Sequence, residues 1–517
     1  MRAHGDVGGS AKTPSSALFA GAFAIAALVP ALLFRGFMVD DALITARYAA
    51  NLAAGHGYRL NANGPVTDGV TPLGFAYVLA PFAKGGALAA FAAAKWIGIG
   101  AWTIGAAVIG LAVRRVIVES SPVRTGGAPP FANGVSDLGG AGARQRDRGW
   151  APRFVLLSAV IPLAILVTSA PLAAWAASGM ETGLVLGLGA LAIGLAILER
   201  PVAAMACAGI AAGWRPELVP WAGTLGIGWW LAHRKEPGGA RAWVAAVLSV
   251  APFVVVACVR VAVFGRPAPL SIFAKAPDAR LGLYYAAACA LLAGPPAIVA
   301  PLAFSRLSRF EKAVVGSVVA HVIAIGLAGG DWMPLSRLMV PVLPTIAIAA
   351  LLLAKQAAPW ATVVRMLIAL GGQLFVLVKV GPTAARVAED RVRVLEELRP
   401  ALATSRVVAS LDIGWVGAVT EGALVDLAGV TDPRIAALPG GHTTKQIPAG
   451  LLDARGVDTL VLLLAPGEEV ATPWTRSRWA RGVEGWIATT PNIEESFRVV
   501  ATSSPPLVRY VVLRRVP

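Results

Sequence analysis

Charged residues are scarce in this chain: Asp, Glu, Lys and Arg make up 14% of its 517 residues, whereas apolar residues make up 56%. Soluble domains carry roughly a quarter of charged residues, so this composition excludes an ordinary soluble protein. Cysteine is also rare. Cys207, Cys258 and Cys289 all lie in apolar stretches and show no CxxC or metal-ligand spacing. The sequence therefore gives no sign of a disulfide framework or of a cysteine-bound metal.

Long apolar stretches are what the chain has instead. They recur from residue 16 to residue 380, and about 20 such residues are enough to cross the bilayer as a helix. We therefore predict a polytopic α-helical membrane protein, with about 11 transmembrane helices in residues 16–380. The first stretch follows Arg2 and Lys12 and lacks a small-x-small cleavage site. We expect an uncleaved first helix, with residues 1–15 in the cytoplasm.

One section of the chain leaves its topology open. Residues 72–113 contain two apolar stretches, yet they must connect an external loop with an internal one. An odd number of crossings is required, so either one stretch is re-entrant or three short helices are present. The sequence alone does not decide between these alternatives.

The basic residues indicate topology rather than a polyanionic partner. The formal net charge is +16, but a nucleic-acid-binding protein needs its cations on one solvated face. Here they gather in loops between apolar stretches, at residues 114–153, 233–241 and 306–312. Basic loops of this kind stay in the cytoplasm. The sequence therefore predicts no nucleic acid partner, and it places residues 37–70 and 381–517 on the opposite, extracytoplasmic side.

The C-terminal residues 381–517 have the composition of a soluble domain. Residues 384–402 show the period of an amphipathic helix. Four short apolar runs are typical of strands: 406–411, 423–427, 459–464 and 510–513. We predict a small α/β domain on the outer face of the membrane.

Two adjacent carboxylates, Asp40 and Asp41, follow directly after the first apolar stretch. If residues 40–52 are helical, the 100° step places Asp40, Arg47 and Asn51 on one stripe, with Asp41 and Tyr48 beside it. Gly55 and Gly57 then end the helix, and His56 is a turn residue between them. The alternative is an interfacial helix whose aspartates only favour its N-terminal dipole.

Other ionisable residues also fall at the predicted external ends of apolar stretches. Such residues can anchor a helix at the membrane interface, or they can line a functional cavity, since charges near the membrane are costly unless they are paired or used. Their convergence on one side favours the cavity. The residues are Glu181, Arg215, Glu217, Lys275, Asp331 and Arg337.

These segments together resemble a known family. The run 40–77, with Asp40-Asp41, Arg47-Tyr48, Gly55-His56-Gly57 and Thr71-Pro72-Leu73, is similar to the first external loop of GT-C glycosyltransferases, in particular the mycobacterial terminal β-1,2-arabinofuranosyltransferases. Further similar segments follow in the same order: Ser178-Gly179-Met180-Glu181-Thr182-Gly183-Leu184, Trp214-Arg215-Pro216-Glu217, residues 264–275, and Gly329-Gly330-Asp331-Trp332-Met333-Pro334 with Arg337. The resemblance covers roughly residues 35–345 and extends weakly into residues 426–432.

The resemblance implies an inverting transferase in the inner (plasma) membrane of a bacterium. Its donor would be a polyprenyl-phosphate sugar, and its acceptor a hydroxyl of an envelope glycan, lipid or protein. Asp40 would be the general base, and Asp41 would orient the acceptor or, as in some relatives, help to hold a divalent cation; no other cofactor is implied. Phosphate ligands would be Arg215, Lys275 and Arg337. The residues that would contact substrates or support the others are Arg47, Tyr48, His56, Glu181, Glu217 and Asp331. Arg47 can instead form an ion pair with Asp40.

Two other classes of protein share part of this pattern. A transporter or flippase of a lipid-linked sugar would have many helices and a cationic cavity, but such proteins often show inverted repeats and charges near the midplane, which this sequence lacks. A non-catalytic protein of envelope assembly would explain the external domain but leaves the Asp40-Asp41 pair without a role.

Overall fold

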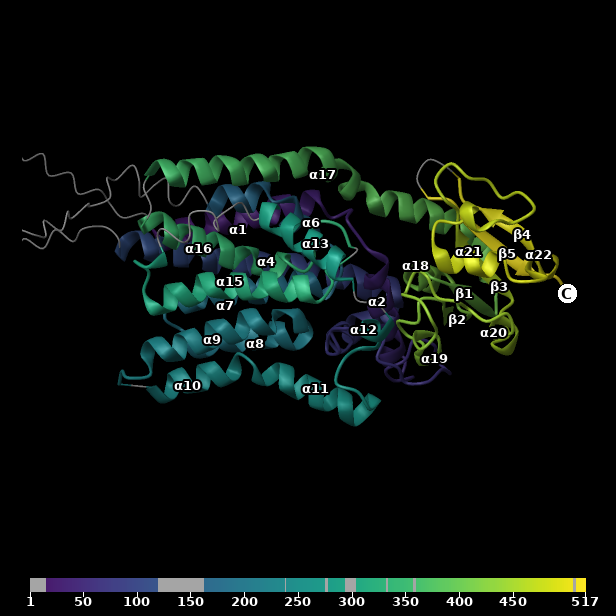
Figure 1. The fold of residues 1–517 in the computed structure, drawn as a ribbon, viewed down its shortest axis with the longest axis horizontal. Helices are drawn as coiled ribbons and strands as arrows, with labels where there is room; N and C mark the ends of the chain where they lie inside the picture. Colours follow the sequence, from purple (N-terminus) through teal and green to yellow (C-terminus); the bar gives the residue numbers. More distant parts are fainter. Residues whose placement is uncertain are drawn as a thin grey trace, which may run out of the picture.

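The computed structural model describes residues 15–119, 162–237, 239–274, 278–292, 304–331, 333–356, 359–504 and 508–517. Most of the predicted cytoplasmic basic loop therefore lies outside the described residues. The chain folds into an elongated bundle of helices, here called the helical part, and a smaller α/β part at one end of it (Figure 1). The long helix α17, Pro359–Ala403, runs along the bundle and connects the two.

Several helices have the length and composition of membrane spans, which is compatible with the predicted membrane protein. Five qualify among the described residues, and a sixth does if two helices bent by 118° at their junction form one span. The spans are α1 (Ser16–Leu33), α4 (Ala87–Glu119), α10 with α11 (Gly239–Leu248 and Ala251–Phe264), α15 (Arg309–Leu327) and α17; the bent pair is α6 (Ala170–Ala176) with α7 (Glu181–Ile197).

The remaining predicted stretches contain shorter helices: α8 (Pro201–Trp214), α9 (Val219–His233), α13 (Ala279–Leu292) and α16 (Leu343–Gln356). The count of about 11 crossings therefore stays a prediction. In residues 72–113, the first stretch forms only the short helices α3 (Phe75–Leu79) and η1 (Ala80–Gly85), and α4 is the single helix of span length. A single span in this section gives the odd number of membrane crossings that the predicted topology requires.

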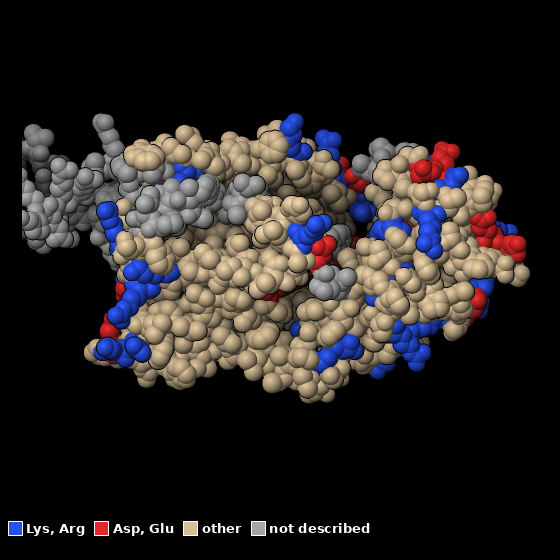
Figure 2. Space-filling model, in the orientation of Figure 1, with Lys and Arg blue, Asp and Glu red and all other residues tan. Residues whose placement is uncertain are grey.

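Small residues allow the central helices to pack closely, as is usual in membranes. α4 lies against α6 and α7 through glycines that have no room for a side chain. A Cβ atom on Gly98 would lie 2.4 Å from the Ala176 carbonyl oxygen, and one on Gly187 would lie 2.5 Å from that of Ala101. In Figure 2 the side of this bundle is largely uncharged, whereas Lys and Arg gather at its far end and both signs of charge lie around its boundary with the α/β part.

The α/β part contains a five-stranded sheet with the order β2-β1-β3-β5-β4. β1 (Val407–Ser410) is parallel to β2 (Ala423–Asp426) and to β3 (Thr459–Leu463), whereas β5 (Tyr510–Arg515) is antiparallel to β3 and to β4 (Phe497–Thr502). The sequence predicts four of these strands. It misses β4, an edge strand whose middle residues are exposed and whose pairing is interrupted by a bulge.

The two parts are joined by a shared hydrophobic core and by a continuous helix, not by a flexible linker. α17 continues without a break across residue 381, where the composition changes, so the predicted amphipathic helix is the end of a longer one. Buried apolar side chains of α2 (Asp40–Ala53), α3, α17 and α18 (Ile413–Val419) pack together with those of β1, β3 and β5. The remaining short elements of the α/β part are α19 (Pro433–Ala436), α20 (Leu451–Ala454), η4 (Arg476–Arg478), α21 (Gly482–Ala488) and α22 (Ile493–Ser496).

Candidate functional site

A cavity of about 410 Å³ lies where the helical part meets the α/β part. Both parts contribute to its wall, and the wall combines apolar side chains with ionisable ones. From the predicted site, the structure brings Asp40, Asp41, Glu181, Arg215 and Arg337 to this cavity. The α/β part and α17 add Arg391, Asp412, Trp415, His442, Arg481 and Tyr510, which the sequence did not indicate.

Asp40 connects the two parts through its carboxylate. Its Oδ2 accepts a hydrogen bond from the Gly414 N–H at 2.9 Å, and its Oδ1 accepts one from the Trp415 N–H at 2.7 Å. These N–H groups belong to the first turn of α18, whose own N-cap residue, Asp412, makes no side-chain cap. Asp40 thus caps a helix 374 residues further along the chain, and a carboxylate in this position also complements the helix dipole.

The environment of Asp40 favours its protonated form more than water does. Burial raises the pKa of Asp40 to about 7, the nearby negative charge of Asp412 adds to this rise, and the two backbone hydrogen bonds oppose it. Asp412 behaves in the opposite way. Burial alone would raise the pKa of Asp412, but the charge and hydrogen bonds of Arg481 outweigh this effect and hold it below the usual range. Two neighbouring carboxyls whose pKa values are pushed apart are typical of acid–base sites.

Arg215 and Arg337 line the cavity from the helical part, and each is held in a buried ion pair. Arg215 bonds through Nη1 to Glu181 Oε1 at 2.7 Å and through Nε to Glu217 Oε1 at 2.6 Å. Arg337 Nε bonds to Asp331 Oδ2 at 2.6 Å. The carboxylates predicted to support the arginines therefore hold them in place. Buried charges require such partners, because an isolated ion in a low-dielectric interior is very costly.

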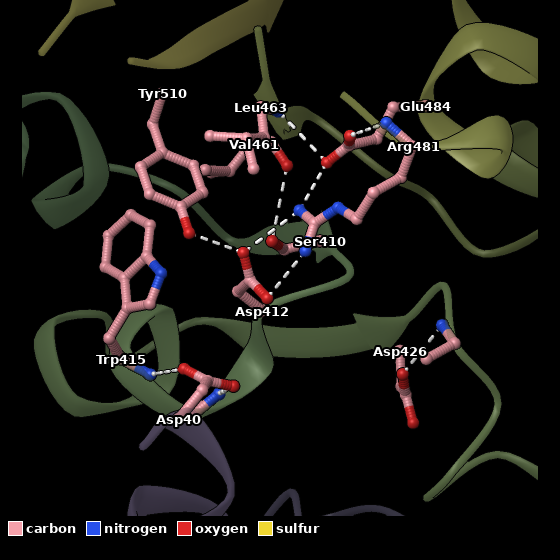
Figure 3. Close-up of polar contacts among 12 residues, drawn as sticks. Asp40, Ser410, Asp412, Trp415, Asp426, Val461, Leu463, Arg481, Glu484 and Tyr510 are labelled. Carbon is pink, nitrogen blue, oxygen red and sulfur yellow. Dashed lines mark hydrogen bonds and ion pairs between the residues drawn. The ribbon is translucent and has the colours of Figure 1, made fainter. Parts of the chain in front are cut away.

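A second set of polar and charged side chains, in the α/β part, is connected by hydrogen bonds and ion pairs (Figure 3). Asp412, Arg481 and Tyr510 of this set line the cavity. Asp412 lies two residues after the end of β1, at the carboxyl end of the parallel strands. Arg481 binds it through both terminal nitrogens, at 2.8 and 3.0 Å, and also binds Glu484 at 2.5 Å. The Tyr510 hydroxyl donates to Asp412 Oδ2 at 2.5 Å and accepts from Arg391 Nη1 at 3.2 Å.

Arg47, expected at the site or in an ion pair with Asp40, holds the other end of α18. Its guanidinium donates to the carbonyl oxygens of Leu60, Gly417, Thr420 and Gly422 at 2.6 to 3.3 Å. The expected ion pair is therefore wrong. The physical reason is that a helix C-terminus presents unpaired carbonyls that attract a cation. Burial lowers the pKa of Arg47 to about 10, so it remains charged at neutral pH.

Tyr48 and His56, two predicted residues of the segment that begins at Asp40, are not among the described residues that line the cavity. The Tyr48 hydroxyl is buried and shares a hydrogen bond of 2.7 Å with Thr67 Oγ1. His56 is exposed in a turn whose flanking glycines, Gly55 and Gly57, have φ values of 79° and 84°. Lys275 lies outside the described residues, so its predicted phosphate contact stays a prediction.

The loop that carries the Thr71-Pro72 motif is fixed by an ion pair that the sequence did not suggest. Arg260 of α11 is buried and bonds to Asp68 Oδ2 at 2.8 Å, and it also donates to the carbonyls of Val70 and Thr71. This contact ties the loop to α11. Gly69, Val70, Thr71 and Pro72 consequently form one wall of the cavity.

Some of the cavity residues that the sequence analysis did not identify have a recognisable sequence signal. Asp412 ends a run of strand residues, and the carboxyl edge of parallel strands is a common site for ligands. Arg391, Arg481 and Tyr510 carry no local motif, and they reach the cavity only through the packing of α17, of the N-terminus of α21 and of β5. Among the described residues, no group of three or more His, Cys, Asp or Glu side chains is arranged to hold a metal ion. A divalent cation at Asp41 stays a prediction.

Comparisons with known proteins return no relative. No protein-family model, no curated protein and no solved structure matches this chain.

Proposed function

We propose that this chain is a membrane glycosyltransferase of the GT-C type. It transfers a sugar from a polyprenyl-phosphate donor to a hydroxyl of an envelope glycan, lipid or protein, on the outer face of a bacterial inner membrane. The proposal includes about 11 transmembrane helices and a catalytic cavity beneath the extracytoplasmic α/β domain. The resemblance of the ordered sequence motifs supports this assignment.

One observation carries the proposal: residues far apart in the sequence meet in a single cavity beside the membrane helices. Asp40 and Asp41 come from the first loop, Glu181 and Arg215 from the middle of the chain, and Arg337 from a late loop. Apolar side chains of Phe37 and Met38 line the same space. An ionisable cavity next to apolar helices suits a substrate with a phosphate sugar at one end and a lipid tail at the other.

The chemistry needs a base on one side of the sugar and cations on the other. Asp40 takes the proton of the acceptor hydroxyl while the acceptor oxygen forms its bond to the anomeric carbon. The bond from that carbon to the phosphate oxygen breaks, and the phosphate leaves with the electron pair. A single displacement inverts the anomeric configuration. A carboxyl with a pKa near 7 is well matched to this role at neutral pH, because a base near the working pH combines ionisation with proton affinity.

The experiment is a transfer assay with purified protein in nanodiscs and a panel of radiolabelled polyprenyl-phosphate sugars, followed by identification of the labelled product. The wild type is expected to transfer at least one sugar, and Asp40→Asn is expected to transfer none while it remains folded. Glu389→Gln, an exposed substitution on α17, is the control. Full activity of Asp40→Asn would remove Asp40 as the base, and inactivity of the wild type toward every donor would contradict the proposal.

The double role of Asp40 requires one more comparison. An Asn side chain offers only one oxygen to the two N–H groups of α18, so loss of activity can arise from loosened docking. Arg47→Gln loosens the opposite end of α18 without entering the cavity. If Asp40 is the base, Arg47→Gln retains most transfer at a matched loss of thermal stability, whereas Asp40→Asn does not.

A further inference from the structure

The described lining of the cavity contains four arginines, and three of them are already neutralised. Arg215, Arg337 and Arg481 each form short ion pairs with buried or largely buried carboxylates. Recruiting one of these arginines to a substrate phosphate would leave its carboxylate buried without a cation, which is strongly unfavourable. These three arginines therefore hold the wall of the cavity together rather than offer a charge to a ligand.

Arg391 differs from the other three. No ion pair joins it to a carboxylate among the residues that the structure describes, and its hydrogen-bond partner is the neutral Tyr510 hydroxyl at 3.2 Å. Its guanidinium also lies 5.7 Å from the centre of the Tyr510 ring. Because that hydroxyl donates its own proton to Asp412, Tyr510 separates Arg391 from the Asp412 carboxylate. Among the described residues Arg391 thus has no direct ion-pair partner, and the charges of Asp412 and Asp40 act on it only from a distance.

The position of Arg391 fits the phosphate of a lipid. It lies on α17, the helix that leaves the membrane bundle for the α/β part, and Val387, one turn earlier on the same helix, also lines the cavity. A lipid tail directed toward the bundle would pass the apolar Val387, Phe37 and Met38 while its phosphate reaches Arg391. A guanidinium can bind two phosphate oxygens at once through its forked donors.

We propose that Arg391 is the residue that binds the phosphate of the lipid donor, and that Tyr510 positions it. This proposal rests on the proposed transferase function, since it names the group that the leaving phosphate contacts. Arg215 and Arg337 then act mainly through the carboxylates they hold.

The test measures how strongly the protein prefers a lipid phosphate to the matching alcohol. Equilibrium binding of farnesyl phosphate and of farnesol is compared in nanodiscs at one pH. The wild type is expected to prefer farnesyl phosphate, and Arg391→Gln to lose about tenfold or more of that preference, as the loss of a charge-assisted hydrogen bond implies. Arg391→Lys keeps the positive charge but loses the paired donors of the guanidinium, so it should retain only part of the preference for farnesyl phosphate. Arg386→Gln, exposed on the same helix, is the matched control and keeps the preference.

Tyr510→Phe is a second variant, which tests the proposal even if Arg391→Gln does not fold. It keeps the ring packing and removes the hydroxyl, and a preference reduced by a few-fold is expected. If Arg391 served only to balance the charge of Asp412, Arg391→Gln would shift the pH profile and leave the preference for phosphate unchanged, which overturns the proposal. Equal binding of farnesyl phosphate and farnesol by the wild type would also overturn the proposal. A preference that depends on Arg391 in a protein that transfers no sugar supports the phosphate site while contradicting the transferase function.

Discussion

The burial of Asp40 predicts how sugar transfer depends on pH. The pKa of Asp40 is raised to about 7, first by burial and then by the negative charge of Asp412. A group with this pKa is about nine-tenths ionised at pH 8 and about one-tenth ionised at pH 6. The base acts in its deprotonated form, so the rate falls as pH falls. We expect single-turnover transfer to decrease about tenfold from pH 8 to pH 6, with the slope of one proton.

The cause of the shift can be tested in the same assay. Asp412→Asn removes the neighbouring negative charge, so the midpoint of the profile is expected to move to lower pH. Glu389→Gln on α17 should leave the midpoint unchanged, and size-exclusion chromatography confirms that each variant is folded. The other charged groups that face Asp40 are Asp41 and Arg391. A flat profile between pH 5 and pH 8, or an unchanged midpoint in Asp412→Asn, would refute this reasoning.

Three further predictions concern how the cavity is held together. Arg47→Gln leaves buried carbonyls at the end of α18 without their charged donor and should destabilise the protein by about 3 kcal/mol, seen as a lower thermal midpoint than in Arg386→Gln; equal midpoints would contradict it. Gly414→Ala would place a Cβ atom 2.0 Å from the Asp40 carbonyl oxygen, so the α/β part should become sensitive to protease, and unchanged resistance would argue against this docking. Arg215→Met leaves two carboxylates without their cation at a cost of about 3–5 kcal/mol, and adding Glu181→Gln should recover part of it; no recovery would sink the ion-pair argument.

The helical architecture was predictable because its signal is local. Apolar stretches of span length follow from the bilayer thickness. α2 ends at Ala53, just before the turn with Gly55 and Gly57 that the sequence indicates. Four strands of the α/β part were visible as apolar runs. The topology of residues 72–113 was not predictable from the sequence. The structure shows that its first stretch forms only the short helices α3 and η1, which are too short to cross a bilayer.

The site residues that belong to sequence motifs were predictable. Those that reach the cavity through long-range packing were not. Helical periodicity places Asp40 and Arg47 seven residues apart on one stripe of α2, but no local rule names their partner. That partner is α18, whose two ends Asp40 and Arg47 bind from 374 and 370 residues away. Arg391 and Tyr510 likewise reach the cavity only because α17 and β5 pack against α2 and α18. Long-range pairing of this kind leaves no periodic trace in a single sequence.

We propose that the cavity at the junction of the two parts receives the lipid-linked donor. Photo-crosslinking tests it most directly, with a polyprenyl phosphate that carries a diazirine next to the phosphate and with mass spectrometry of the labelled peptides. We expect labels in peptides from residues 37–45, 178–181 and 387–391, and we expect these labels to be lost when excess unlabelled lipid phosphate is added. Labels confined to peptides that do not line the cavity would contradict it.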